Sequence, residues 1–289
     1  MKTYNDIYLD ARRRLREGGI EAYGPEAMMI VCAASGKSRE QLLRDIRMFT
    51  ADGACESKTA GALSRRIAGE PLAYILGEWE FYGLPVRIDR GVLIPRTDTE
   101  ILAGEGIRIA RSCRAARVMD LCAGSGCVGL AIAANTAACR VTLVEKSAAA
   151  LRLCKINVLK NALSRSVVCI AADAMERPPV MLGKYDLIVC NPPYIPTGDI
   201  DKLDDSVRLY EPIMALDGGA DGLDFFRAVA ERWTPLLRDG GHLAFECGAG
   251  QSDDVKAIMA GRGLTDVRAV GDTLGHERVI VGASGQAPA

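Results

Sequence analysis

Hydrophobic and polar residues follow different patterns in different parts of the chain. From about residue 106, short runs of branched apolar residues alternate with longer helical segments, which is typical of βαβ units that build a parallel sheet. The runs predict seven strands, at residues 117–121, 140–144, 167–171, 186–190, 242–246, 267–270 and 278–281. Helices are expected up to residue 134 and over residues 147–160, 222–237 and 252–260, with a longer loop at 195–221. We therefore expect an α/β domain with a mostly parallel sheet over residues 106–283.

The first 70 residues instead show helical patterns separated by short polar breaks. Helices are predicted over residues 6–17, 26–34, 39–49 and 57–68. Gly18 is expected to stop the first helix, and Ser38 is expected to cap the third. A helical domain over residues 1–70 fits either a packing role or the recognition of a macromolecular substrate, and the sequence does not separate the two.

Residues 71–105 show neither of these two patterns and are interpreted as a linker. Two alternating runs, 78–82 and 86–89, flank the turn signal Gly83-Leu84-Pro85, which predicts a β-hairpin. Thr97 to Thr99 are then expected to cap a helix that begins near Glu100. The last six residues, 284–289, are expected to form a disordered tail.

Composition narrows the class of protein. A chain of 289 residues is longer than one hydrophobic core usually serves, so two domains are expected. Lys and Arg total 36 and Asp and Glu total 37, so the chain has no overall attraction for nucleic acid, although this leaves a local basic patch open. The ten cysteines form no CxxC pair and only two histidines are present, so no metal site is predicted. Reduced thiols, the absence of a signal peptide and the absence of an apolar span predict a cytoplasmic protein without membrane association.

A glycine-rich loop follows the first strand of the α/β domain. Gly124 to Gly129 matches GxGxxG between a strand and a helix, so the backbone can approach a ligand beside the free N–H groups of the helix end. Glu145 ends the next strand, about 20 residues further on, where an acidic group accepts hydrogen bonds from ribose hydroxyls. These features suit a dinucleotide and S-adenosylmethionine equally well.

Three further features favour S-adenosylmethionine. Asp120 precedes the loop, where a carboxylate can meet the cationic methionine end of the cofactor. Asp173 and Ala174 follow the third strand and are placed to contact an adenine edge. The tetrapeptide Asn191-Pro192-Pro193-Tyr194 follows the fourth strand, and a hydride-transfer enzyme has no need of it.

The tetrapeptide itself has two interpretations. Two prolines end the preceding strand because neither donates to a sheet ladder, so an ordinary strand-terminating turn is one interpretation. In the other, the Asn191 side-chain oxygen and a proline carbonyl accept hydrogen bonds from a planar NH2 group, and Tyr194 packs against its plane. Open α/β sheets bind ligands at the edge where this tetrapeptide lies.

Several segments together resemble the protein-(glutamine-N5) methyltransferases that modify peptide chain release factors. The similarity extends across most of the chain from about Arg65. It includes the glycine loop, the NPPY tetrapeptide and the segments 69–77, 81–84, 93–96, 98–100, 210–212, 215–219 and 221–223, with Glu246, Gly248, Gln251, Asp272, Gly275 and Arg278. NPPY alone occurs in many amino-methyltransferases, whereas its combination with Ile94-Pro95-Arg96 is highly specific.

The resemblance implies a Rossmann-like, seven-stranded methyltransferase domain and S-adenosylmethionine as the cofactor, with S-adenosylhomocysteine as the product. It implies that the cofactor lies on Cys122, Ala123, Gly124, Ser125 and Gly126, with its ribose on Glu145, its adenine near Asp173 and Ala174, and its methyl group facing Asn191. It further implies that Asn191, Pro192, Pro193 and Tyr194 bind the substrate. The substrate would be the glutamine of the Gly-Gly-Gln motif in a release factor, and no stable nucleic-acid binding is expected.

Two positions depart from the family pattern. Cys122 stands where the family usually has the first loop glycine, and a cysteine would be strained there if the backbone needs a positive φ. Thr97 replaces the usual proline after Arg96. Glu246, Gln251 and Arg278 are interpreted as buried structural pairs rather than ligand contacts.

The expected mechanism needs no strong base. The Asn191 side-chain oxygen and the Pro192 carbonyl would accept the amide hydrogens and direct the nitrogen lone pair toward the sulfonium methyl group. Three alternatives share features of this sequence: a glutamine methyltransferase acting on a ribosomal protein, an adenine-N6 nucleic-acid methyltransferase, and a binding module with an inactive pocket. Near-zero net charge and the Ile94-Pro95-Arg96 segment argue against the nucleic-acid enzyme.

Overall fold

The computed structural model describes residues 2–50 and 53–285 and divides the chain into two compact units. The first unit comprises Met1–Gly77 with Asp205–Tyr210, and the second comprises Glu78–Asp204 with Glu211–Ala289. The helical unit thus extends past residue 70 to include two further short helices, at Leu72–Leu76 and Asp205–Arg208. Part of the expected tail, residues 286–289, lies outside the described residues.

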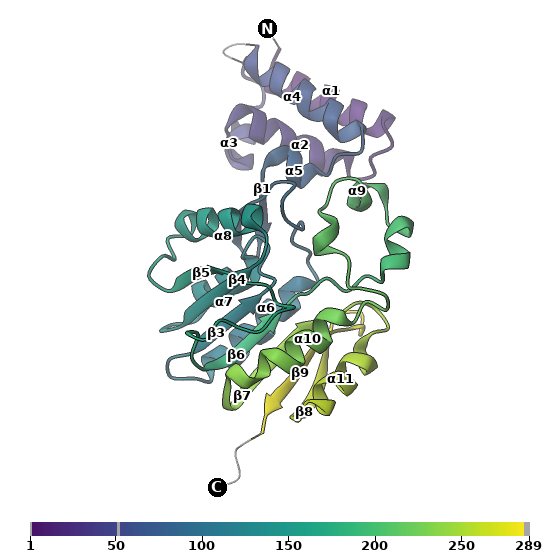
Figure 1. The fold of residues 1–289 in the computed structure, drawn as a ribbon. Coiled ribbons are helices and arrows are strands. Elements are labelled where there is room, and N and C mark those ends of the chain that lie inside the picture. Colours follow the sequence, from purple (N-terminus) through teal and green to yellow (C-terminus); the bar gives the residue numbers. More distant parts are fainter. Residues whose placement is uncertain (1, 51–52, 286–289) are drawn as a thin grey trace. The chain divides into compact units, whose positions relative to one another are not determined.

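The first unit is helical, as the sequence predicts (Figure 1). Its helices are α1 (Tyr4–Glu17), α2 (Tyr23–Ser35), α3 (Arg39–Arg44), α4 (Ala54–Ile67), α5 (Leu72–Leu76) and α9 (Asp205–Arg208). Thr3 and Asp6 form a capping box at the start of α1, and Ser38 and Gln41 form one at the start of α3. The apolar faces meet in a core that includes Leu15, Ile30, Val31, Leu42 and Leu63.

Several helix bounds differ from the prediction. The third helix ends at Arg44 rather than near residue 49, because the chain turns at Asp45 and then forms a bridge from Phe49 to Thr3. Helix α2 begins before Pro25, which occupies its first turn, where the missing N–H costs nothing. Helix α5 was not predicted, because five residues are too few to show a helical period.

The second unit begins with the predicted hairpin, β1 (Glu78–Phe81) and β2 (Leu84–Arg87). Its turn is the pair Tyr82-Gly83, with φ values of 51° and 74°, rather than Gly83 to Pro85. Two consecutive residues with positive φ suit a tight two-residue hairpin turn, and this leaves Leu84 and Pro85 paired in the ladder.

Helix α6 (Thr99–Arg111) follows, so the expected boundary at residues 105 and 106 falls inside a helix. Asp98 is its N-cap residue, but no side chain caps this end within the described residues, so the capping expected from Thr97 to Thr99 is wrong. The helix is held instead through backbone N–H groups that donate to the carbonyls of Arg96, Thr97 and Asp98.

The core of the unit is one seven-stranded sheet of order β5-β4-β3-β6-β7-β9-β8. The strands are β3 (Arg117–Leu121), β4 (Arg140–Glu145), β5 (Val167–Ala171), β6 (Tyr185–Cys190), β7 (Leu237–Glu246), β8 (Leu264–Gly271) and β9 (Glu277–Ser284). Only β9 pairs antiparallel with its neighbours β7 and β8. This confirms the predicted α/β class with a mostly parallel sheet.

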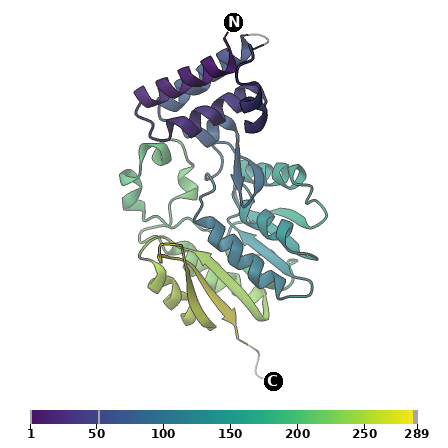
Figure 2. The same ribbon diagram turned by 180° about the vertical axis from the view of Figure 1, so that it is seen from behind.

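Helices cover both faces of this sheet, which leaves the ends of its strands for a ligand. Helix α6 packs with α7 (Cys127–Asn135) on one face, and α10 (Asp224–Arg232) packs with α11 (Ser252–Gly261) on the other (Figures 1 and 2). Helix α8 (Ala148–Lys160) lies along β4 and β5, with Ser147 as its N-cap. A large apolar cluster that includes Phe226, Trp233 and Phe245 fills the space between the sheet and α10.

The second half of the sheet departs from the predicted bounds. Strand β7 begins at Leu237 rather than His242, and β9 continues to Ser284, a residue assigned to the tail. Helix α10 covers only part of the predicted 222–237, since a short 3-10 turn with Pro235 follows it. The expected loop at 195–221 contains the short helices η1 (Thr197–Lys202), α9 and η2 (Ile213–Ala215).

Candidate active site

Strand register gathers the predicted site residues at one edge of the sheet. Leu121 at the end of β3 is paired with Cys190 at the end of β6, and on its other side with Val144 of β4. From β3 the chain first adds β4 and β5 on one side and then returns to add β6 on the other side. The strand order therefore reverses at β3. Ligands of open α/β sheets bind at such a switch point. The glycine loop after β3 and the tetrapeptide after β6 therefore leave the sheet side by side.

The glycine loop adopts the left-handed backbone that its glycines allow. Gly124 and Gly126 have φ values of 57° and 83°, and α7 begins directly after Gly126. Cys122 also has a positive φ, of 57°, so the cysteine at the usual glycine position is held in an unfavourable backbone conformation, as expected. Burial raises the pKa of the neighbouring Cys190 thiol well above its usual value, and Cys122 beside it contributes.

Asp120 and Glu145 hold this loop in place. Asp120 Oδ2 accepts a hydrogen bond from the Gly129 amide at 2.8 Å, and Glu145 Oε2 accepts one from the Gly124 amide at 2.8 Å. Glu145 Oε1 accepts from the Ser147 amide at 2.7 Å. Burial raises the pKa of Asp120 to about 7 and also raises that of Glu145. Burial thus opposes ionisation of both carboxyl groups more strongly than these backbone hydrogen bonds favour it.

Asp173 and Ala174 lie beyond β5, next to the same loop. Asp173 pairs with Lys146 at 2.7 Å and accepts a hydrogen bond from the Met175 amide at 2.9 Å. The pKa of Asp173 is lowered, because these partners outweigh its burial. The Ala174 carbonyl accepts a hydrogen bond from the indole N–H of the buried Trp233 at 2.9 Å, which fixes the backbone at this position.

The tetrapeptide is held rigidly at the end of β6. Pro192 and Pro193 are buried, and the Asn191 amide nitrogen donates to the Thr99 hydroxyl at 3.2 Å. Burial raises the pKa of the Tyr194 phenol above its usual value, so this group stays neutral at physiological pH. The Ile195 amide donates to the carbonyl of Leu216, and the Gly218 amide donates to the carbonyl of Ile195.

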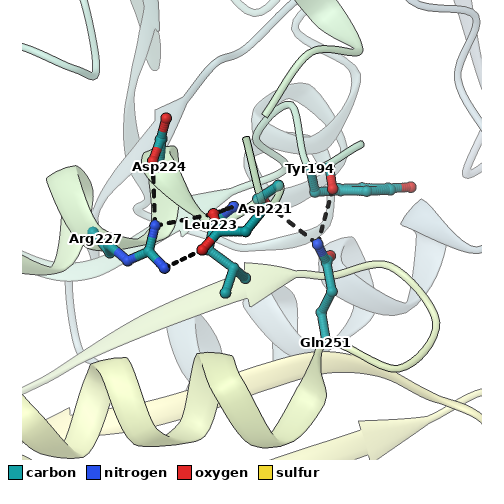
Figure 3. A network of polar contacts seen from close by, with 7 residues as sticks. Tyr194, Asp221, Leu223, Asp224, Arg227 and Gln251 are labelled. Carbon is teal, nitrogen blue, oxygen red and sulfur yellow. Dashed lines mark hydrogen bonds and ion pairs between the residues drawn. The ribbon is translucent and has the colours of Figure 1, made fainter. Parts of the chain in front are cut away.

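Gln251 fastens the Tyr194 backbone to the next loop. Its side-chain nitrogen donates to the Tyr194 carbonyl at 2.9 Å and to the Gly222 carbonyl at 3.4 Å (Figure 3). Its side-chain oxygen accepts from the Gly248 amide at 2.9 Å. The same view shows Asp221, which caps the turn at Leu223 and pairs with Arg227 at 2.5 Å. Gln251 therefore has the structural role expected for it.

A cavity of about 430 Å³ joins these elements, a size in the range of small-molecule sites. Most predicted site residues line it, namely Cys122, Ala123, Gly124, Ser125, Glu145, Asp173, Ala174, Asn191 and Pro193, together with Asp120. Gly126, Pro192 and Tyr194 lie outside the lining formed by the described residues. Gly126 serves instead as the N-cap residue of α7, while substrate contacts of Pro192 and Tyr194 stay predictions.

The prediction missed the other walls of the cavity. They comprise Gly91, Val92, Leu93, Pro95, Thr99, Lys146, Pro212, Ile213, Met214, Ala215, Asp217 and Phe225, among others. Two of these segments are connected, because the buried Glu211 pairs with Arg96 and also accepts from the Ile94 amide at 3.1 Å. Both segments carried the family resemblance, which was the available signal that they belong to the site.

Two family models match the chain. Residues 6–77 match the PrmC N-terminal domain, and residues 107–203 match the methyltransferase small domain. The release factor glutamine methyltransferase of Geobacter sulfurreducens is 38% identical over 277 residues, which are 95% of this chain and 94% of the relative. The release factor glutamine methyltransferase of Thermodesulfovibrio yellowstonii is 34% identical over 258 residues, 89% of this chain and 91% of the relative.

A solved structure supports the fold independently. The catalytic domain of hMettl16, in complex with MAT2A 3′UTR hairpin 6, matches with a TM-score of 0.59 and 17% identity, over 78% of this chain and 82% of that one. At that identity the likeness concerns the fold alone. No helix within residues 2–50 and 53–285 combines the length and apolar character needed to cross a bilayer. The two full-length relatives confirm the resemblance found in the motifs, and the chain belongs to the family of release factor glutamine methyltransferases.

Proposed function

We propose that the chain transfers a methyl group from S-adenosylmethionine to the side-chain amide nitrogen of the glutamine in the Gly-Gly-Gln motif of a release factor. The observation that carries this proposal is that Asn191 lines the same cavity as the glycine loop and Glu145. The group that would bind the amide and the loop that would support the nucleoside therefore line one space of suitable size.

The charges of the cavity favour S-adenosylmethionine over a dinucleotide. Its walls carry the carboxyl groups of Asp120, Glu145, Asp173 and Asp217, whereas Lys146 is the one cation among the described lining residues and is paired with Asp173. Such walls suit a ligand with a sulfonium, an ammonium group and several hydroxyl donors. The diphosphate of a dinucleotide would be repelled by them.

These positions support the following cofactor contacts. Asp120 would face the cationic methionine portion, and Glu145 would accept hydrogen bonds from the ribose hydroxyls. Asp173 and Ala174 would lie at the adenine, and the loop Cys122 to Gly126 would support the nucleoside. When bound, S-adenosylmethionine supplies an electrophilic methyl group.

The chain itself aligns the nucleophile rather than ionising it. An amide nitrogen is weakly nucleophilic because its lone pair is delocalised into the carbonyl. Acceptance of its two hydrogens by the Asn191 side-chain oxygen and the Pro192 carbonyl would direct that lone pair toward the cavity, and alignment of reactants is worth about 7 kcal/mol or more in favourable cases. The same two oxygens would stabilise the positive charge that develops on nitrogen. The proton can then leave to water, and Tyr194 would restrain the amide plane.

The choice of acceptor rests on the relatives, whose names specify a release factor and a glutamine. Because release factors act on ribosomes, the reaction would take place in the cytoplasm. The helical unit, residues 1–77 with 205–210, is proposed as a recognition element for that protein, in keeping with its match to the N-terminal domain of the same family.

The test is a comparison of acceptors. Purified chain and labelled S-adenosylmethionine are incubated separately with a release factor, a ribosomal protein and duplex DNA, followed by mass analysis of each acceptor. We expect a gain of one methyl group on the glutamine of the release factor Gly-Gly-Gln peptide. Methylation of the ribosomal protein or of adenine instead would overturn the proposal. If no acceptor is methylated, calorimetry with S-adenosylmethionine shows whether the pocket binds the cofactor, and so distinguishes an inactive pocket from a wrong acceptor.

A further inference from the structure

Asn191 has a buried acidic neighbour that the mechanism above does not use. Cys190 of β6 is paired in parallel register with Phe245 of β7, so the residues that follow them, Asn191 and Glu246, lie next to each other. Glu246 is 3% exposed and lies outside the described cavity lining. It is therefore a neighbour of Asn191 that does not line the cavity.

Glu246 faces hydrogen-bond donors on one side only. The Thr99 hydroxyl and the Asn191 amide both lower its pKa as side-chain donors, yet burial is stronger and raises that pKa to about 7. Its Oε2 atom is buried and has no hydrogen-bond partner among the described residues. The charged groups that face it are Asp98 and Arg278, which pair with each other at 3.1 Å.

This arrangement distinguishes the two ends of the Asn191 amide. An asparagine side chain has a donor end and an acceptor end of nearly equal size, so rotation by half a turn exchanges them. A carboxylate only accepts hydrogen bonds, and a Thr99 hydroxyl that donates to it has its lone pairs available to the Asn191 NH2 group, 3.2 Å away. Both partners therefore select the donor end.

We propose that Glu246 is a positioning residue for Asn191, whose carboxylate, with the Thr99 hydroxyl, holds the Asn191 NH2 group and so presents the side-chain oxygen to the substrate amide. The inference rests on the proposed function, because only an amide-bearing substrate requires that oxygen. Without Glu246, the Asn191 side chain would be rotated part of the time, with its NH2 group toward the substrate amide. Two NH2 donors would then face each other, and no hydrogen bond could form between them.

The activity test uses Glu246→Gln, which keeps size and removes the acceptor-only character. We expect kcat on a full-length release factor to fall by about tenfold to 100-fold, the range of a lost alignment, while the dissociation constant for S-adenosylmethionine is unchanged. Glu105→Gln is the matched control, since Glu105 is also a buried acid of the second unit but pairs with Arg108 and Arg268 outside the cavity lining. The control should lose stability and keep kcat.

A second measurement does not depend on the acceptor. In an amide-labelled sample, the side-chain NH2 signals of Asn191 should shift as the pH passes through about 7 with Glu246 present, and should not do so in Glu246→Gln. Both samples carry Asp120→Asn, because burial also raises the pKa of Asp120, which lines the same cavity, to about 7. The nearby Tyr194 phenol and the Cys127, Cys190 and Cys247 thiols do not interfere, because burial raises each of their pKa values above the usual value. If Glu246→Gln does not fold, Thr99→Val removes the other partner and should show the same loss of kcat.

The outcomes separate the two proposals. A wild type that methylates no release factor would overturn the proposed function, and the Asn191 signals would still decide the role of Glu246. Unchanged kcat in Glu246→Gln, or Asn191 signals that respond to pH equally in both proteins, would overturn the positioning role. Loss of kcat with retained cofactor binding and a pH response confined to the protein with Glu246 would establish it.

Discussion

The guanidinium of Arg96 forms an ion pair with the buried carboxylate of Glu211, a residue 115 positions further along the chain. The same carboxylate accepts the Ile94 amide, so one side chain fixes the segment before α6 to the segment before η2. Both segments contribute walls to the cavity, through Pro95 on one side and Pro212 on the other. The ion pair therefore holds two walls of the cavity together.

The first prediction concerns this ion pair between Arg96 and Glu211. Glu211→Gln should lower the free energy of unfolding by about 1–3 kcal/mol, because a charged acceptor shared by two buried or half-buried donors is lost. Arg96→Met should destabilise as well, and the double variant should be less unstable than the sum, since each single change already breaks the pair. Urea unfolding of the four proteins measures this coupling. Strictly additive effects would show that the pair contributes no stability of its own.

The second prediction concerns Asn191. Asn191→Ala should abolish most methyl transfer, because the acceptor that aligns the substrate amide is removed, yet the glycine loop, Asp120 and Glu145 all remain in place. Binding of S-adenosylmethionine should stay within about tenfold of the wild type, or about 1.4 kcal/mol. Single-turnover transfer and calorimetry are the two measurements. Normal turnover by this variant would contradict the assigned role.

The strands of the site were predictable from their apolar composition, even β5, which is only partly buried. Strands β3, β5 and β6 appear in the sequence as short, mostly apolar runs closed by turn signals, and their carboxyl ends coincide with the predicted ones. The first half of β7 was missed because Arg238 to Gly241 is polar and glycine-rich, as a loop would be. Its ladder with β6 is irregular there, which lets such a segment pair without a clear pattern.

The site was predictable only where its residues follow strands. Asn191, Glu145 and Asp173 were found because parallel strands bring their carboxyl ends to one edge. The Arg96–Glu211 pair and the Asn191–Glu246 contact depend on tertiary register between distant segments, which a single sequence does not display. The wall formed by Pro212 to Ala215 belongs to a short 3-10 segment with no period to detect.

The third prediction concerns the strained cysteine of the glycine loop. A non-glycine residue at a φ of 57° costs about 1–2 kcal/mol, whereas glycine costs about 0.5–1 kcal/mol in lost chain entropy. Cys122→Gly should therefore stabilise the protein slightly, by about 1 kcal/mol or less in urea unfolding. Cys122→Ala keeps the Cβ atom and serves as the control. An equal gain in both variants would mean that removal of the thiol, and not relief of backbone strain, causes the gain in stability.

The fourth prediction concerns pH. The pKa of Asp120 is raised to about 7 by burial, so this group favours the folded state below its ordinary pKa, and that contribution is lost as the pH rises through about 7. A bound cation favours the carboxylate form, so cofactor binding should tighten between about pH 6 and about pH 8 and release a proton near neutrality.

Calorimetry in two buffers of different ionisation enthalpy measures this proton release. Asp120→Asn still accepts from the Gly129 amide and should remove that part of the pH dependence, while any titration of the cofactor itself persists in both proteins. Identical proton release by the variant and the wild type would exclude Asp120 as the group that meets the cation.

The last prediction concerns the backbone contact that supports Tyr194. A Cβ atom on Gly222 would lie 2.4 Å from the Tyr194 carbonyl oxygen and 2.8 Å from the Gln251 side-chain nitrogen, so Gly222→Ala must displace the end of the tetrapeptide. Overpacking of this kind costs about 1–3 kcal/mol, and the displaced tetrapeptide should also lower kcat.

Gly250→Ala is the matched control for Gly222→Ala. Gly250 has a φ of 84° against 76° for Gly222, but an added Cβ atom there meets no atom of the described residues within 4 Å. Both variants therefore carry similar backbone strain, and only Gly222→Ala carries the clash with Tyr194. Turnover and urea unfolding should show a loss in Gly222→Ala well beyond that in Gly250→Ala, because the tetrapeptide aligns the substrate only while its backbone is held in place. Equal losses would mean that the contact between these loops does not support the site.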